Sequence, residues 1–284
     1  MPKLRSDLGL GPDDSLLSRK RLPMLYSTTV DIFSRVAEAK AAHLRHDLLA
    51  FLILAMMAGA YVGMGVLVIF SVGQGIDPSI RPIVMGASFG LALMLVMFAG
   101  SELFTGHTMY MTHGLLTGRT GVSDLLRCWG ASWSGNLIGA ILLGAMFVYG
   151  GGGLILGDEA SSFLHVVAEK KMNAHPLALV LNGVLCNWLV CLAIWMAARV
   201  DSDIAKIAVI WVCLYAFIAA GFEHSVANMT IFSVALISEH AASISVDGAV
   251  HNLIFVSIGN IIAGAGIMGI GYWVVGGRPK AKRA

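Results

Sequence analysis

The strongest constraint on this chain is the recurrence of apolar stretches long enough to cross a lipid bilayer. A helix needs about 20 residues to span roughly 30 Å of hydrocarbon, and stretches of that kind cover most of the sequence. They occupy residues 48–72, 84–111, 125–149, 176–199, 207–237 and 250–275. We therefore expect an all-α, six-span polytopic membrane protein.

The composition excludes a soluble globular protein of this length. Hydrophobic residues make up 57% of the 284 residues and charged residues only 13%, and the mean hydropathy is +0.79. Too few polar side chains are present to coat a water-exposed surface, so apolar surface must face lipid. The cysteines at positions 128, 186, 191 and 213 fall in or at the ends of the spans without metal-site or redox spacing, and we expect no cofactor and no metal.

The two ends of the chain are predicted to be cytoplasmic tails, at residues 1–47 and 276–284. Residues 30–40 have helical spacing with an apolar side, which suits a short helix against the membrane face or a neighbouring subunit. A solvated leader helix is an equally good interpretation. Lys and Arg concentrate in the tails and in the loops around Arg119 and Arg199, which places both termini in the cytoplasm by the positive-inside rule.

The spans contain an internal sequence repeat. Residues 99–102 (Ala-Gly-Ser-Glu) are echoed by residues 220–223 (Ala-Gly-Phe-Glu), and Gly135-Asn136 is echoed by Gly259-Asn260. Glycine-marked turns are also predicted in the first and fourth spans, at residues 59–63 and 183–187.

This order predicts two repeats of three spans each, at about residues 48–150 and 176–275. An odd number of spans forces the two halves into opposite orientations, which gives an aquaporin-like inverted 3+3 repeat with broken second and fifth helices.

The predicted breaks at residues 100–106 and 221–228 place glycines and carboxylates at bilayer depth. Such backbone is tolerated only where it lines a cavity enclosed by protein, and half-helix ends offer amide donors to an anion. The pattern therefore favours an anion pathway. We expect Glu102 and Glu223 to brace the breaks by accepting hydrogen bonds from the freed backbone, and His224 to act in the pore because imidazole changes charge near neutral pH.

Three separated strings resemble the signature segments of the formate/nitrite transporter family. They are residues 100–106 (Gly-Ser-Glu-Leu-Phe-Thr-Gly), 187–193 (Asn-Trp-Leu-Val-Cys-Leu-Ala) and 221–229 (Gly-Phe-Glu-His-Ser-Val-Ala-Asn-Met). Residues 106–109 (Gly-His-Thr-Met), together with Asn187-Trp188, resemble the bacterial nitrite channel branch more than the formate branch. The long charged leader is the main departure from the family, so any gating by the tail stays open.

The resemblance implies a homopentamer of aquaporin-like protomers in the bacterial inner membrane, each protomer with its own pore. It also implies two hydrophobic constrictions. The outer one would consist of Phe89, Val190 and Phe217, and the inner one of Leu93, Leu103 and Phe104. The four-residue spacing of Phe89 and Leu93 puts both on one helix face, as such a pore requires.

The resemblance assigns roles to polar residues as well. Thr105 and His224 would face each other between the constrictions, Asn187 and Glu223 would support the histidine, and Lys171 would attract anions from the outer vestibule. An apolar constriction is unfavourable for a naked charge. A proton moved to the anion, or a polarising contact from His224, would remove that cost.

The sequence thus predicts a channel or transporter for small monovalent weak-acid anions, with nitrite and protons as the expected partners. Formate and hydrosulfide remain alternatives within the family, and passive and proton-coupled flow are both open. A neutral-solute aquaporin-like facilitator is a different class, but the paired Asn-Pro-Ala breaks of that class are absent. No nucleophile or metal motif indicates an intramembrane enzyme, no nucleic-acid partner is expected, and a purely structural scaffold would not need broken helices.

Overall fold

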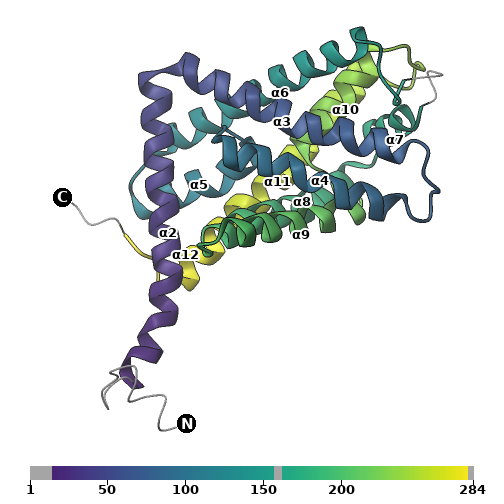
Figure 1. The fold of residues 1–284 in the computed structure, drawn as a ribbon. Helices are drawn as coiled ribbons and strands as arrows, with labels where there is room; N and C mark the ends of the chain where they lie inside the picture. Colours follow the sequence, from purple (N-terminus) through teal and green to yellow (C-terminus); the bar gives the residue numbers. More distant parts are fainter. Residues whose placement is uncertain (1–14, 157–161, 281–284) are drawn as a thin grey trace, which may run out of the picture.

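A computed structural model describes residues 15–156 and 162–280, with side chains from residue 26 onward. The described residues form helices joined by loops (Figure 1). The helices are α2 (Ser15–His46), α3 (Leu48–Gly73), α4 (Arg81–Ala99), α5 (Phe104–Thr117), α6 (Val122–Tyr149), α7 (Phe163–Met172), α8 (Pro176–Ala197), α9 (Asp203–Ala219), α10 (Ser225–Ile237), α11 (Val246–Ile261), the π-helix η1 (Ile262–Ile270) and α12 (Gly271–Val275).

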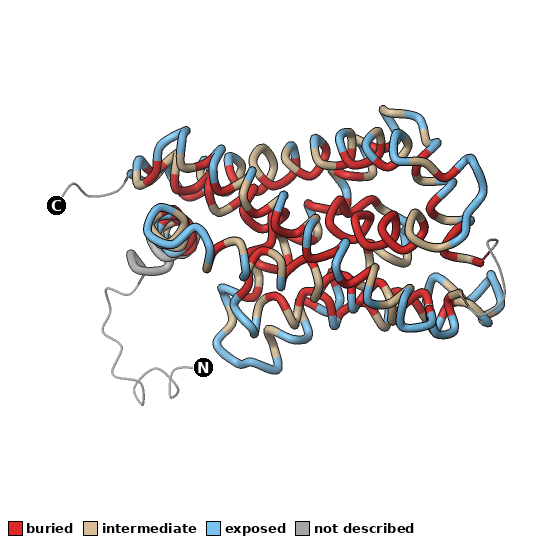
Figure 2. The backbone as a smooth tube through the Cα atoms, turned by 90° about the horizontal axis from the view of Figure 1, so that it is seen from above, coloured by how far each residue is buried: buried red, intermediate tan, exposed pale blue. Residues whose placement is uncertain are grey.

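Within the described residues, five helical stretches are long and apolar enough to cross a bilayer: Leu48–Gly73, Arg81–Ala99, Val122–Tyr149, Pro176–Ala197 and Val246–Val275. The sixth predicted segment, residues 207–237, is divided between α9 and α10, which have 17 and 13 residues. The prediction of an all-α membrane protein is confirmed. Buried residues face the interior of the bundle and exposed residues lie mostly on its outside (Figure 2).

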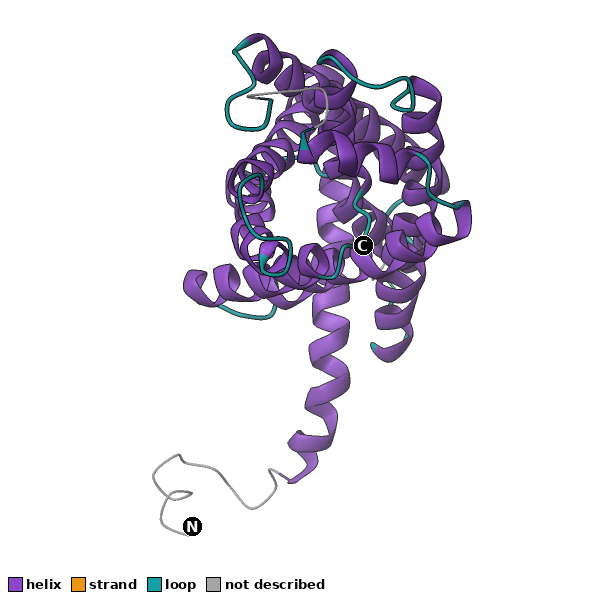
Figure 3. Ribbon diagram, turned by 90° about the vertical axis from the view of Figure 1, so that its right-hand side faces the viewer, coloured by secondary structure: helices purple, strands orange, loops and turns teal. Residues whose placement is uncertain are grey.

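Helix α2 crosses one end of the bundle at a steep angle to the spans, and α7 lies at the opposite end (Figure 1). Figure 3 looks from the α7 end, and α2 runs behind the bundle and extends beyond it. With 32 residues α2 is much longer than the short helix expected. Its apolar side packs on its own chain: the Phe33 ring lies 5.2 Å from Tyr110 and 5.9 Å from His113, and Ser34 Oγ donates to the His113 carbonyl.

Two helices are broken where the sequence predicted. Helix α4 ends at Ala99 and α5 begins at Phe104, while α9 ends at Ala219 and α10 begins at Ser225. Gly100 and Gly221 have φ angles of +75° and +74°, a left-handed conformation that glycine adopts without a Cβ penalty. Glycine at these two positions therefore lets the chain leave one half-helix and enter the next within a few residues.

The predicted turns at residues 59–63 and 183–187 do not exist, because α3 and α8 run through them as continuous helices. The glycines there serve close helix contact instead. A Cβ built on Gly59 would lie 2.1 Å from the carbonyl oxygen of Asn136 on α6. A Cβ on Gly183 would lie 2.8 Å from the carbonyl oxygen of Val256 on α11. Because glycine has no side chain, α3 packs closely against α6 and α8 packs closely against α11. This close packing positions the helix ends at both breaks.

Candidate functional site

Three cavities follow one another through the interior. A wide cavity of about 610 Å³ lies under α7, a central pocket measures about 10 Å³, and a cavity of about 180 Å³ lies beside α2. The wide cavity and the central pocket share Phe89, Phe217 and His224 in their linings. The central pocket and the cavity beside α2 share Leu93 and Leu103. These shared side chains are therefore the partitions between neighbouring cavities.

Most of the residues expected at the two constrictions line these cavities. The rings of Phe89 and Phe217 meet edge to face with centroids 5.5 Å apart, and Val190 lines the central pocket beside them. Phe104 is not among the residues lining the three cavities; it is buried in the core. The central pocket has about the volume that one water molecule needs, so it does not hold a larger species in this conformation.

The break between α9 and α10 places His224 at the central pocket. His224 is the N-cap of α10, and the backbone N–H of Ala227 donates to its Nδ1 over 3.1 Å. Because Nδ1 accepts this bond, the single proton of the neutral ring resides on Nε2. Nε2 lies 3.3 Å from Oγ1 of Thr105, and the ring stacks on Phe217 with centroids 5.9 Å apart. The cap thus fixes both the orientation of the ring and its hydrogen-bonding role.

Thr105 is held from the other side by Asn187. Nδ2 of Asn187 donates to the Thr105 carbonyl over 3.3 Å and to Oγ1 of Thr108 over 3.0 Å. Asn187 was expected to support the histidine, but it contacts Thr105 rather than His224 in these bonds. Thr105 is fully buried. Its support therefore comes from α8 and that of His224 from α10, and the two side chains meet between the broken helices.

Two asparagines satisfy the backbone that the breaks expose. Asn136 Nδ2 donates to the carbonyls of Ala55 and Glu102 over 2.7 and 2.9 Å, and its Oδ1 accepts from Phe104 N–H over 2.9 Å. The sequence marked Asn136 as part of a repeat but gave no role for it.

Asn260 makes the corresponding set at the second break. Its Nδ2 donates to the carbonyls of Gly183 and Glu223 over 2.8 and 3.2 Å, and its Oδ1 accepts from Ser225 N–H over 3.1 Å.

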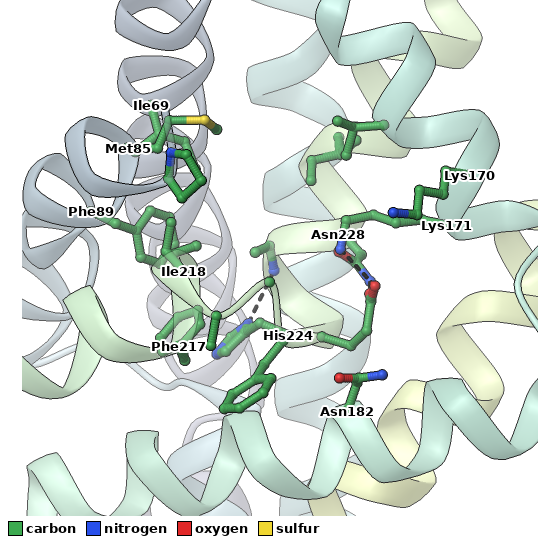
Figure 4. Close-up of a pocket in the computed structure, with 18 of the residues that line it drawn as sticks. Ile69, Met85, Phe89, Lys170, Lys171, Asn182, Phe217, Ile218, His224 and Asn228 are labelled. Atoms are coloured by element: carbon green, nitrogen blue, oxygen red, sulfur yellow. Dashed lines mark hydrogen bonds and ion pairs between the residues drawn. The ribbon is translucent and has the colours of Figure 1, made fainter. Parts of the chain in front are cut away.

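The carboxylates bind side chains, and the prediction that they accept hydrogen bonds from the freed backbone is wrong. At the wide cavity, Lys171 Nζ lies 2.8 Å from Glu223 Oε1, and Asn228 Nδ2 donates to Glu223 Oε2 over 2.6 Å. Figure 4 shows Lys171 next to Asn228 on one side of the cavity, with Phe89 and Phe217 on the opposite side. Glu223 was also expected to support His224, but its carboxylate binds Lys171 and Asn228 instead.

A second cluster at the other break was missed by sequence reasoning. Glu102 Oε2 accepts from Lys40 Nζ and lies 2.7 Å from Nε2 of His107. His107 follows Glu102 by five residues, the same spacing that separates Asn228 from Glu223. That spacing was the available signal, although the partner Lys40 lies on a helix remote in sequence. In the described residues no group of three or more His, Cys, Asp or Glu could hold a metal ion.

Comparison with known proteins agrees with this architecture. The formate/nitrite transporter family model matches residues 30–274. Nitrite transporter NirC of Escherichia coli (strain K12) is 48% identical over 235 residues, which cover 83% of this chain and 86% of the relative. Formate channel BtFdhC of Bacillus thuringiensis is 32% identical over 253 residues, 88% of this chain and 96% of the relative.

Solved structures show the same likeness. One described as an FNT family ion channel has a TM-score of 0.84 and 45% identity, covering 87% of this chain and 98% of that one. Another, described as a pentameric formate channel with formate bound, has a TM-score of 0.67 and 28% identity, covering 80% and 96%. These relatives are transporters and channels rather than enzymes. The chain is a multi-pass membrane protein that belongs to the formate/nitrite transporter family.

Proposed function

We propose that this protein is a channel for small monovalent weak-acid anions, with nitrite as its principal cargo. The observation that carries the proposal is the line of three cavities, separated by Phe89 and Phe217 on one side and by Leu93 and Leu103 on the other, with the Nε2–H of His224 at the pocket between them. The choice of nitrite rests on the relatives named nitrite transporters, of which the Escherichia coli protein is 48% identical.

The proposed architecture is a six-span inverted repeat in which each half supplies one broken helix. The support comes from matching contacts: Asn136 ties the first break to α3, and Asn260 ties the second break to α8. The bond that Asn136 donates to the Glu102 carbonyl in the first half is matched in the second half by the bond that Asn260 donates to the Glu223 carbonyl. Two halves of opposite orientation bring both breaks to the centre, where cavity-lining backbone is tolerated.

Passage of an anion between Phe89 and Phe217 requires loss of its water shell, which is costly without a replacement hydrogen bond. His224 supplies that bond. While Ala227 N–H holds Nδ1, the neutral ring carries one proton, on Nε2. Releasing that proton fully would leave an imidazolate unless the cap opened and Nδ1 took up another proton. The geometry therefore supports polarisation of the anion by a donated hydrogen bond, assisted by the Thr105 hydroxyl, with proton transfer requiring release of the cap.

We further propose a homopentamer in the bacterial inner membrane with both termini in the cytoplasm. The pentamer follows the solved pentameric formate channel, and the orientation follows the distribution of Lys and Arg in the sequence. In this orientation the cavity beside α2 is the inner vestibule and the wide cavity is the outer one. Lys171, which lines the outer vestibule, would draw anions toward the constriction even though Glu223 offsets much of its charge.

Formate is the second candidate cargo, because BtFdhC is named a formate channel and a neighbouring structure holds formate. Hydrosulfide is a third weak-acid anion of similar size. A neutral-solute facilitator is disfavoured by the Lys171 and Lys40 clusters beside the two vestibules, which neutral cargo does not need.

Stopped-flow uptake into liposomes containing the purified protein tests the proposal. Nitrite, formate, hydrosulfide and glycerol would each be offered with and without a pH gradient. Fast nitrite uptake with slow glycerol uptake is expected. Glycerol uptake that matches or exceeds nitrite uptake would overturn it in favour of a neutral-solute facilitator.

A further inference from the structure

The outer vestibule has an excess of positive charge in its wall. Among the described residues, the charged side chains that line this 610 Å³ cavity are Arg81, Lys170, Lys171 and Glu223. Lys171 and Glu223 form an ion pair, with 2.8 Å between Nζ and Oε1, so their charges largely cancel for an anion that is still several ångströms away. The attraction that such an anion meets at this entrance therefore comes mainly from Arg81 and Lys170.

Arg81 is held in the wall by two neighbours that leave its charge intact. Its Nε and Nη2 donate to the Ile76 carbonyl over 3.2 and 2.8 Å. Its guanidinium carbon lies 4.2 Å from the centre of the Phe163 ring at the start of α7, a cation–π contact that orients the cation without neutralising it. The Ile76 bonds do not use Nη1, whose N–H groups can donate to an anion oxygen.

No carboxylate of the described residues forms an ion pair with Arg81. Asp77 precedes it by one helical turn, but the Asp77 carboxylate is exposed and accepts from the backbone N–H and the hydroxyl of Ser79. Arg81 is half-buried. A fixed and partly buried cation is screened less by salt than one in open water.

Lys170 differs from Arg81 in both respects. It is exposed, and it makes no hydrogen bond or ion pair with the described residues. A lysine ammonium on a flexible stem stays strongly hydrated, and at ionic strength of about 0.15 M its field falls off over about 8 Å. Lys170 therefore contributes less to the field inside the vestibule than Arg81 does.

The position of Arg81 along α4 places it outward of the constriction. Arg81, Met85 and Phe89 follow one another at four-residue intervals, and all three line the vestibule. Eight residues of helix rise by about 12 Å, which is the axial separation of Arg81 from Phe89. Figure 4 shows Met85 and Phe89 on one side of the vestibule, opposite the two lysines. An anion entering at the α7 end thus passes Arg81 before it reaches the Phe89 ring.

We propose that Arg81 is the principal anion-capture residue of the outer entrance. Its guanidinium concentrates small monovalent anions in the vestibule before they lose water at Phe89, and the Lys171–Glu223 pair supplies the smaller share of the attraction. This inference rests on the proposed anion channel and assigns a binding residue to its outer mouth.

The test is nitrite current in planar bilayers, with the half-saturating nitrite concentration measured from each side. A C-terminal epitope tag marks the α2 side, since residues 276–280 lie at that end (Figure 1). From the α7 side, Arg81→Gln should raise that concentration about two- to fivefold in about 20 mM inert salt and less than about 1.5-fold in about 500 mM. From the α2 side the value should not change.

Arg127→Gln is the matched control. It removes one positive charge from an exposed side chain near the start of α6, and Arg127 lines none of the three cavities. This variant should keep the natural value from the α7 side at both salt concentrations. Size-exclusion chromatography checks the assembly of each variant.

Charge is separated from structure by labelling Arg81→Cys from the α7 side with methanethiosulfonate reagents. The four natural cysteines are buried and so are poorly reactive. A trimethylammonium label should bring the half-saturating concentration at low salt back toward the natural value, and a sulfonate label should raise it further. A merely structural role for Arg81 predicts the same effect from both labels.

Equal effects of the two labels, or an Arg81→Gln shift of the same size at both salt concentrations, would overturn the inference. Should Arg81→Gln fail to assemble, the two labels on Arg81→Cys decide by the same criterion. Absence of any nitrite current in the natural protein would instead overturn the proposed function itself.

Discussion

Replacing Asn136 with leucine removes the side chain that holds the first helix break to α3. Three hydrogen bonds disappear, two donated by Nδ2 to the Ala55 and Glu102 carbonyls and one accepted from Phe104 N–H. The site is fully buried, so no water replaces them. The Ala55 carbonyl keeps its hydrogen bond within α3, but the Glu102 carbonyl and the Phe104 N–H at the break lose their partner. Leaving these two backbone groups unpartnered costs about 1–3 kcal/mol each, or about 2–6 kcal/mol in all.

The assay is thermal unfolding of the purified oligomer in detergent. Domains of roughly 150–250 residues lose about 2–4 °C per kcal/mol, so Asn136→Leu should lower the midpoint by at least about 4 °C. Ser132→Ala is the control on the same helix: Ser132 is also fully buried, but its hydroxyl donates only to carbonyls of its own helix. That variant should melt within about 2 °C of the natural protein. An Asn136→Leu midpoint as high as that of Ser132→Ala would refute the assignment.

Three further outcomes are expected. Gly139→Leu should abolish assembly on size-exclusion chromatography, because a Cβ there would lie 1.9 Å from the Met56 carbonyl oxygen; a normal oligomer peak would contradict the close contact of α3 and α6. Thr105→Val should slow nitrite uptake and change its pH dependence with the oligomer intact; normal flux per pore would leave Thr105 a purely structural role. Burial lowers the pKa of His165 from its usual 6.5, with repulsion from His240 adding to the effect. The folded state therefore binds protons less readily than the unfolded state, and thermal stability should fall as pH drops through about 6.5. His165→Gln should flatten that decline, and an unchanged pH profile would count against it.

Periodicity and composition were sufficient for the five long apolar helices of the described residues and for the positions of the two breaks. Gly100 and Gly221 indicated the breaks, because no other residue adopts a left-handed backbone conformation as readily as glycine. The same reasoning misread the glycines of α3 and α8 as turns. A helix glycine that admits a neighbouring backbone is indistinguishable from a turn glycine until the neighbour is known, and Asn136 lies far from Gly59 in the chain.

The chemistry of the breaks was less accessible. The sequence offered Glu102 and Glu223 as ligands for the freed backbone, yet Asn136 and Asn260 fill that role and the carboxylates pair with lysines. An amide both donates and accepts and so satisfies carbonyl and N–H groups together, whereas a carboxylate only accepts. The choice between them depends on contacts between residues more than 30 positions apart, which periodicity does not report.

The most direct test of the account is nitrite flux through His224→Asn. Asparagine is a favourable N-cap residue, so its Oδ1 can accept from Ala227 N–H and α10 keeps its start, while the ring and its Nε2–H are lost. In liposomes that contain equal amounts of assembled protein, stopped-flow nitrite uptake should fall to near the protein-free rate, or lose the pH dependence of the natural protein. Uptake at the natural rate with the natural pH dependence would contradict a pathway that passes His224.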